Sequence, residues 1–278
     1  MEQTRKNYYI ELLRFIFCVI ILLHHSGFVS ENGSGIFPSG GVIADAFFML
    51  TGYFACAHMA RHSINLENAM GYSVKYTLSK IKRVLPYTTF GILIVYIPEF
   101  LHTRGASFGV IVNKLYTMTV ELLLLPATGI IKMDLGTVRN APLWYLSALL
   151  PALPVAMFIS LKWKDIFKNY LVWLLPLSIQ GWFVVRFGGA LPWMDFAGFI
   201  NSGVIRGFSG IVMGFGIYYM SQIGLNHSES YYADHGGENK SLKIKRLIFT
   251  FAEILLLALI IINIIRGVGG YDEVGTIY

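Results

Sequence analysis

The stretch from Tyr8 to Phe28, YYIELLRFIFCVIILLHHSGF, decides the fold of this chain. A membrane helix needs about 20 mostly apolar residues to cross roughly 30 Å of hydrocarbon, and this stretch is long enough. Charged groups interrupt it and no small-residue cleavage site follows it, so it does not resemble a removable signal peptide. We therefore predict a permanent membrane helix that carries Glu11, Arg14, His24 and His25.

The composition extends this prediction to the whole chain. Of its 278 residues, 55% are hydrophobic and 14% are charged, and its mean hydropathy is +0.59. Soluble domains carry about 25% charged residues, so this chain has too little polar surface to be one. Its 2 cysteines exclude a disulfide-stapled scaffold. The fold class that we predict is all-α, a polytopic transmembrane helix bundle forming a single domain over residues 1–278.

Seven apolar stretches are long enough to span the membrane, and an eighth, Leu115–Ile131, is ambiguous because it contains Glu121 and Pro126. Cytoplasmic loops are enriched in Lys and Arg, and this bias holds here only if the eighth stretch does not cross. We therefore predict about seven spans plus one re-entrant or interfacial segment, a cytoplasmic N-terminus and a cytoplasmic loop from Arg61 to Arg83. The predicted spans are Tyr8–Phe28, Gly41–Ala60, Val84–Leu101, Pro142–Leu161, Tyr170–Val185, Ala197–Ser221 and Leu247–Ile265.

Helix geometry places three charged groups of the first span on one stripe. Arg14 and His25 are eleven residues apart, which returns to within about 20° of the same face and separates them by roughly 16 Å. Glu11 lies one turn before Arg14, where it can pair with the guanidinium, whereas His24 is turned about 80° away. In one interpretation Arg14 snorkels to the interface and the histidines lie among headgroups. In the other, Arg14 anchors an anionic ligand and His25 is a general base or acyl carrier.

Two more charged residues lie in predicted spans. Asp45, near the start of the second span, is expected at the depth of His25, where it either orients the imidazole or caps the helix. Arg206 lies in the sixth span, where it either binds an anion or pairs with a carboxylate such as Asp195 or Glu253. We favour the structural pairing slightly.

Other patterns add little chemistry. His58 and His62 have the i, i+4 spacing of metal ligands but lack a third ligand, so we assign them to an interfacial helix end and expect no metal. Walker, HExxH and GxSxG sequences are absent, which argues against a nucleotide-driven pump on this chain. The net charge of +6 marks cytoplasmic loops, so we expect no nucleic-acid partner.

The chain resembles the acyltransferase 3 family at five motifs that follow one another in the family's order. They are Glu11, Arg14 and His25 in the first span; GVIADAFFMLTGY from Gly41 to Tyr53, with Asp45 inside it; KIKRVLP from Lys80 to Pro86; LWYLS from Leu143 to Ser147; and Arg206-Gly207. We call LWYLS the tryptophan motif, after Trp144. Many members of the family carry a glutamate shortly after this motif, where this chain reads Ala148-Leu149-Leu150.

The resemblance implies an integral-membrane O-acyltransferase of ten or so spans, so we expect this chain to lack its last two or three helices. It implies a bacterial inner-membrane protein without a bound cofactor that uses cytoplasmic acyl-CoA, most often acetyl-CoA. The acceptor would be a hydroxyl of a cell-surface carbohydrate, such as O-antigen or exopolysaccharide, or of its lipid-linked precursor. The residues that we assign are Arg14, His25 and Asp45 for catalysis, Arg14, Lys80, Lys82 and Arg83 for the CoA phosphates and other anionic groups, and Glu11, Trp144 and Arg206 in support.

Two rival functions stay open at this point. A transporter or flippase for a glycan intermediate would also use buried Arg and His, although we find neither an internal repeat nor paired discontinuous helices. An inactive, shortened homologue would keep only the helices. For the enzyme itself, direct attack by a sugar hydroxyl and passage through an acyl-histidine are both open.

Overall fold

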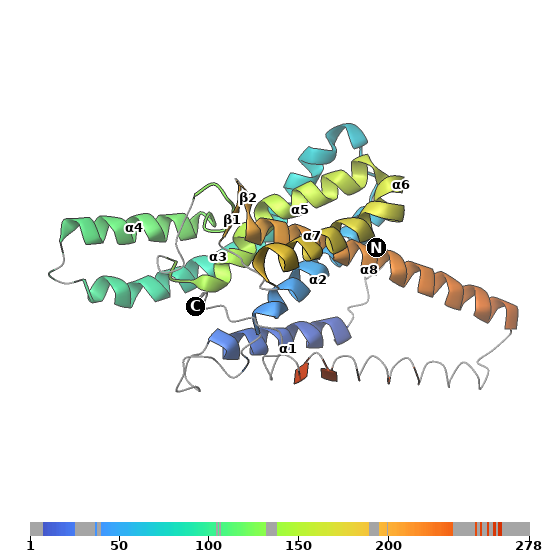
Figure 1. Ribbon diagram of the computed structural model, residues 1–278, viewed down its shortest axis with the longest axis horizontal. Coiled ribbons are helices and arrows are strands. Elements are labelled where there is room, and N and C mark those ends of the chain that lie inside the picture. The colour runs from blue at the N-terminus through green and yellow to red at the C-terminus, as the bar shows by residue number, and fades with distance from the viewer. Residues whose placement is uncertain are drawn as a thin grey trace. The chain divides into compact units, whose positions relative to one another are not determined.

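The computed structural model describes residues 8–25, 37, 40–103, 105, 107–131, 138–188, 195–198 and 200–235, and isolated positions between 248 and 262. Within residues 200–235, side chains are described only as far as Ile223. The long helices are α1 Tyr8–His25, α2 Ile43–Ala60, α3 Ala69–Leu101, α4 Phe108–Leu122, α5 Trp144–Lys162, α7 Val172–Phe187 and α8 Ser202–His235 (Figure 1). Shorter elements are the 3₁₀ turns η1 Gly40–Val42, η2 Leu66–Asn68 and η3 Ala141–Leu143, the short helix α6 Lys164–Ile166, the π-helix η4 Phe167–Leu171, and the strands β1 Phe196–Ala197 and β2 Ile200–Asn201.

The helices agree with the predicted class. Apart from one antiparallel hairpin of two-residue strands, the described part of the chain is built from helices and turns. Five segments are long and apolar enough to cross a membrane, and they overlap the first five predicted spans. The sixth predicted span falls on the hairpin and α8, and the seventh lies largely outside the described residues. The five segments are Tyr8–His25, Gly40–Ala60, Leu66–Leu101, Trp144–Lys162 and Lys164–Phe187.

The third helix departs most from the prediction. We expected a loop as far as Arg83, but α3 begins at Ala69. Its first turns are polar yet packed, since Ser73 and Thr77 are buried and their hydroxyls donate to the carbonyls of Ala69 and Ser73. The prediction was wrong because polar residues end an apolar run without ending a helix. The basic residues of the KIKR motif therefore stand on a helix and not in a loop.

Helix α4 overlaps the first half of the predicted non-crossing segment, Leu115–Ile131. It has 15 residues, a length of about 22 Å that falls short of the roughly 30 Å hydrocarbon layer. It runs antiparallel to the last turns of α3 (Figure 1), with Lys114 bonded to Glu99 and Glu121 bonded to Tyr96. The prediction began the segment at Leu115, whereas the helix begins at Phe108.

The direction of α5 follows from its contacts with α2. Phe48 and Thr51 of α2 contact Tyr145 at the start of α5, and Met59 contacts Ser160 near its end, so α2 and α5 run parallel. A short connection of residues 61–68 joins α2 to α3. Because α3 leads away and α5 returns in the direction of α2, α3 and α5 run in opposite directions, and the number of membrane crossings stays a prediction.

The chain divides into two compact units. The first comprises residues 1–47, 186–190 and 219–278, and the second comprises residues 48–185 and 191–218. In the second unit α2 crosses α8 closely at Gly52 and Gly214. We call its two ends the Trp144 end, where Phe48 contacts Trp144, and the His58 end, where His58 contacts Tyr76.

Candidate functional site

In the first unit, Arg14 and Glu11 form the ion pair that their spacing predicts. Arg14 Nη1 lies 3.2 Å from Glu11 Oε1, and the side chains are 38% and 57% exposed. The pair spans one turn of α1, so the carboxylate fixes the direction of the guanidinium along the helix surface. A cation held in this way suits an anionic ligand that approaches the helix from its side.

The last turn of α1 is held by His24. Its Nδ1 donates to the Phe37 carbonyl oxygen at 2.6 Å, and its side chain packs on Gly40, where an added Cβ would lie 2.6 Å from the His24 Cβ. His25 is exposed, with its ring 4.8 Å from that of His24. Helical spacing correctly separated the two histidines. Helical spacing did not predict the structural role of His24. The sequence signal for that role is the pair Gly40-Gly41, which provides a surface without side chains for the ring to pack on.

The same packing brings the start of α2 to the end of α1. Phe17 and Ile20 of α1 form a buried cluster with Ile43, the first residue of α2. Asp45 follows in the first helical turn and is buried. The expectation that Asp45 lies at the depth of His25, beside its imidazole, stays a prediction.

In the second unit, Arg206 is 3% exposed and its guanidinium carbon lies 5.0 Å from the Trp144 ring centroid. A desolvated cation over an indole is stabilised by the ring quadrupole. Trp144 in turn contacts Phe48 at 5.8 Å between ring centroids, and Tyr145 shares a 2.9 Å hydrogen bond with Thr51. Three motifs that lie far apart in the sequence thus meet at the Trp144 end.

Of the two carboxylates considered as partners of Arg206, the structure describes Asp195 but not Glu253. Asp195 is exposed, and its backbone carbonyl accepts the Ser202 N–H at 2.8 Å. Glu253 lies outside the described residues. Arg206 is buried against Trp144, and the supporting role that we assigned to both residues stays a prediction.

The basic residues of α3 differ in their surroundings. Lys80 is partly buried, and its Nζ lies 4.9 Å from the Tyr76 ring centroid. Lys82 and Arg83 are exposed. All three side chains belong to the half of α3 that begins at the His58 end, so they put positive charge on that part of the second unit.

Sequence reasoning missed a buried carboxylate in α4. Glu121 is fully buried, and its Oε1 accepts the Tyr96 hydroxyl at 3.1 Å and the Arg139 N–H at 2.6 Å. Its Oε2 has no hydrogen-bond partner among the described residues. Nearby, Glu99 pairs with Lys114 at 2.8 Å and with Arg139 at 3.7 Å. A lone acidic residue in an apolar stretch was the available signal.

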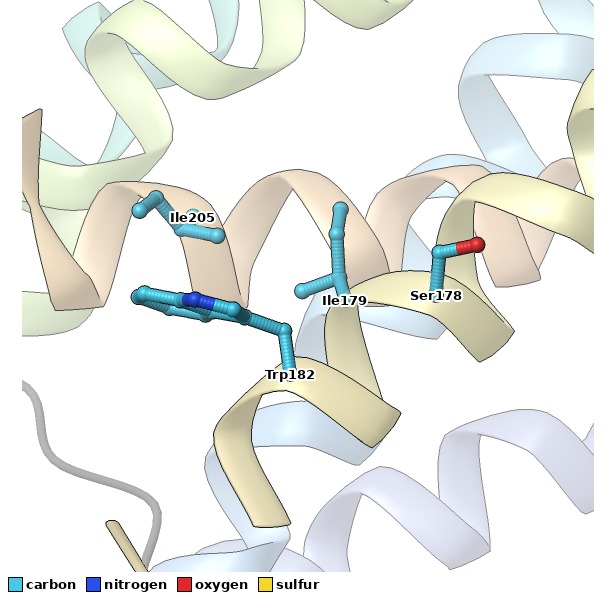
Figure 2. A pocket seen from close by; sticks show the side chains of 4 residues that line it. All are labelled: Ser178, Ile179, Trp182 and Ile205. Atoms are coloured by element: carbon cyan, nitrogen blue, oxygen red, sulfur yellow. The ribbon is translucent and has the colours of Figure 1, made fainter. Parts of the chain in front are cut away.

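A shallow pocket of about 270 Å³ lies between α7 and α8. Figure 2 shows Trp182 and Ile179 of α7 beside Ile205 of α8, with Ser178 at the rim. The lining is apolar apart from one hydroxyl, so this pocket suits a hydrocarbon chain. In the described part of the chain, no group of three or more His, Cys, Asp or Glu residues could hold a metal ion.

Comparison with known families gives a match to a family model described as an acyltransferase domain, over residues 7–269. Searches among curated proteins and solved structures gave no match. The matched region contains α1, with Arg14 and His25, as well as the tryptophan motif and Arg206. This match confirms the resemblance seen in the five motifs, and the chain belongs to the acyltransferase 3 family of membrane acyltransferases.

Proposed function

We propose that this protein is an O-acyltransferase that moves an acyl group, in the first instance acetyl, from cytoplasmic acyl-CoA to a carbohydrate hydroxyl. The acceptor is a surface glycan or its lipid-linked precursor, and the membrane is the bacterial inner membrane with the N-terminus in the cytoplasm. The family match over residues 7–269 carries the proposal. The ion pair on α1 and the joined ends of α1 and α2 support it.

In the direct route, the His25 imidazole removes the proton from the acceptor hydroxyl. The hydroxyl oxygen attacks the thioester carbonyl carbon, the carbon–sulfur bond breaks, and the thiolate takes the proton from the imidazolium, so that an ester and free CoA result. In the acyl-histidine route, one imidazole nitrogen attacks the thioester carbonyl carbon, the carbon–sulfur bond breaks, and the thiolate leaves as free CoA with the proton of the other ring nitrogen. The acceptor hydroxyl oxygen then attacks the acyl carbon, the carbon–nitrogen bond breaks, and the ring takes up the hydroxyl proton. The exposed position of His25 at the end of α1 gives two substrates access to its ring.

Asp45 and Arg14 have different tasks in this proposal. A buried carboxylate such as Asp45 stabilises an imidazolium and fixes the imidazole tautomer. Arg14 lies three turns before His25, at roughly 16 Å along the helix, so it binds an anionic group of the donor and not the reacting carbonyl. Glu11 keeps its guanidinium in place.

The test is transfer of radiolabelled acetyl from acetyl-CoA into glycan by membranes that contain the chain. The proposal expects label in glycan whenever acetyl-CoA is supplied, with or without a protonophore. Loss of labelling with the protonophore would favour a proton-coupled transporter. Labelling that is no greater than in membranes lacking the chain would contradict the proposal.

A further inference from the structure

The segment that leads into Trp144 is anchored at two points. Residues 138–140 lead into the 3₁₀ turn η3, and α5 begins at Trp144 directly after that turn. The first anchor is Arg139, whose backbone N–H donates to Glu121 Oε1 at 2.6 Å. The second anchor is Leu143, which packs in a buried apolar cluster with side chains of α3. The position of Trp144 depends on both anchors.

The two anchors differ in what they fix. Apolar packing has no preferred direction, so the cluster around Leu143 holds that side chain without fixing the direction of the backbone before it. A hydrogen bond to a carboxylate is stronger and directional, and the bond to Glu121 holds the Arg139 peptide against α4. The Arg139 side chain adds a weaker hold, since its Nε lies 3.7 Å from Glu99 Oε1.

Glu121 holds the segment with one oxygen atom. Its side chain is fully buried, and its Oε1 accepts both the Arg139 N–H and the Tyr96 hydroxyl. Its Oε2 has no hydrogen-bond partner among the described residues. An amide could therefore replace this carboxylate, because an amide carbonyl oxygen accepts two hydrogen bonds. The segment needs the position of this oxygen and not the negative charge.

The other side of Trp144 depends on where its ring lies. The Arg206 guanidinium carbon lies 5.0 Å from the Trp144 ring centroid, and Arg206 is buried. A cation is attracted to a ring within about 6 Å of the ring centroid. A displacement of roughly 1 Å would therefore bring this pair to the limit of the interaction.

We propose that Glu121 is a positioning residue for the reaction, which acts through the Arg139 peptide to hold Trp144 over Arg206. This role rests on the proposed function, in which Trp144 and Arg206 support acyl transfer. Loss of Glu121 Oε1 releases the segment before Trp144. Loss of the Tyr96 hydroxyl leaves the bond to Arg139 in place, although it removes the other donor to the same oxygen.

The first measurement follows Trp144 directly and needs no acyl transfer. The fluorescence of Trp144 is taken as the difference between the emission spectrum of a purified protein and that of the same protein with Trp144→Phe. Glu121→Ala should shift this difference spectrum, because the indole moves relative to the Arg206 guanidinium. Glu121→Gln should leave it unchanged, since the amide oxygen keeps both bonds. Tyr96→Phe is the matched control and should also leave it unchanged, although it destabilises the protein.

The second measurement is the rate of acetyl transfer to glycan per amount of folded protein. Glu121→Ala should lower this rate about 10- to 100-fold, as expected when a group near the reaction is displaced by about 1 Å. Glu121→Gln and Tyr96→Phe should keep it. In a Trp144→Phe background Glu121→Ala should lower the rate by less, because a phenyl ring attracts the cation less strongly than an indole. A role in stability alone would not depend on the ring in this way.

The outcomes separate this inference from the proposed function. An unchanged Trp144 spectrum in Glu121→Ala would overturn the inference whatever the transfer rate. It would also fail if Glu121→Gln behaved like Glu121→Ala, because charge and not the position of an oxygen would then matter. An equal fall in rate in both backgrounds would show that Glu121 does not act through Trp144. If the Trp144 spectrum shifts as expected and the native chain transfers no acetyl, only the proposed function is overturned.

Discussion

The crossing of α2 and α8 leaves no room for a side chain at Gly52 or Gly214. A Cβ on Gly52 would lie 2.8 Å from the Ile211 carbonyl carbon, and one on Gly214 would lie 2.8 Å from the Met49 carbonyl carbon. The atom nearest to the added Cβ is a backbone carbonyl oxygen in each case, that of Ile211 for Gly52 and that of Met49 for Gly214. Backbone atoms cannot rotate aside as a flexible side chain can, so Gly214→Ala has to push the helices apart.

The size of the effect follows from the contact distances. Carbon atoms pack at about 3.5–4.0 Å, so the helices must separate by roughly 1 Å. Overpacking of this kind costs about 1–3 kcal/mol, and alanine regains up to about 1 kcal/mol as a better helix former than glycine. We expect Gly214→Ala to lower the free energy of unfolding by about 1–2 kcal/mol. Adding Gly52→Ala should cost less than the sum, because both residues act at one crossing.

The assay is reversible unfolding of the purified protein in mixed micelles by titration with sodium dodecyl sulfate, followed by circular dichroism. Gly91→Ala on α3 is the matched control, since no atom lies within 4 Å of the Cβ that it adds. That variant should be neutral or more stable by up to about 1 kcal/mol. A Gly214→Ala protein as stable as the Gly91→Ala protein would refute the close crossing.

Three further variants are predicted, all measured by the same titration. Tyr96→Phe removes one of the two donors to Glu121 Oε1 and should cost about 1–2 kcal/mol; an unchanged midpoint would mean that this bond adds nothing. Tyr145→Phe breaks the hydrogen bond to Thr51 and should lower the free energy of unfolding by about 0.5–1.5 kcal/mol. Adding Thr51→Val to Tyr145→Phe should lower it little further, because the two hydroxyls are partners in one bond. His24→Ala removes the bond to the Phe37 carbonyl and should cost about 1 kcal/mol. Its control is His102, an exposed histidine at the end of α3 whose Nδ1 donates to the Pro98 carbonyl oxygen of the same helix. His102→Ala should cost less, and the reverse order would show that His24 does not hold the turn.

Contacts within one helix were predictable from sequence because the helical repeat fixes them. The Arg14–Glu11 pair is an i, i+3 contact, and counting residues was sufficient to find it. The same counting separated His24 from His25. The prediction that the segment at α4 does not cross rests on the distribution of basic residues, which depends on the whole chain but not on any particular contact, and it stays a prediction.

Contacts between distant segments were not predictable in the same way. Glu121 meets Tyr96 and Arg139, which are 25 and 18 residues away, and only the packing of α4 on α3 brings them together. The start of α3 was misplaced because hydropathy weighs composition and ignores the hydroxyl bonds that keep Ser73 and Thr77 in a helix. The ring of His58 contacts both His62 and Tyr76 of α3, and the i, i+4 spacing of the two histidines indicated only the first of these contacts.

The central claim is that His25 takes part in acyl transfer from acyl-CoA. The most direct measurement is the rate of label transfer from acetyl-CoA to glycan by the native chain and by His25→Ala, each normalised to the amount of folded protein. His102→Ala provides the matched histidine control. We predict that transfer is lost in His25→Ala and kept in His102→Ala. Transfer at the native rate by His25→Ala would contradict the account.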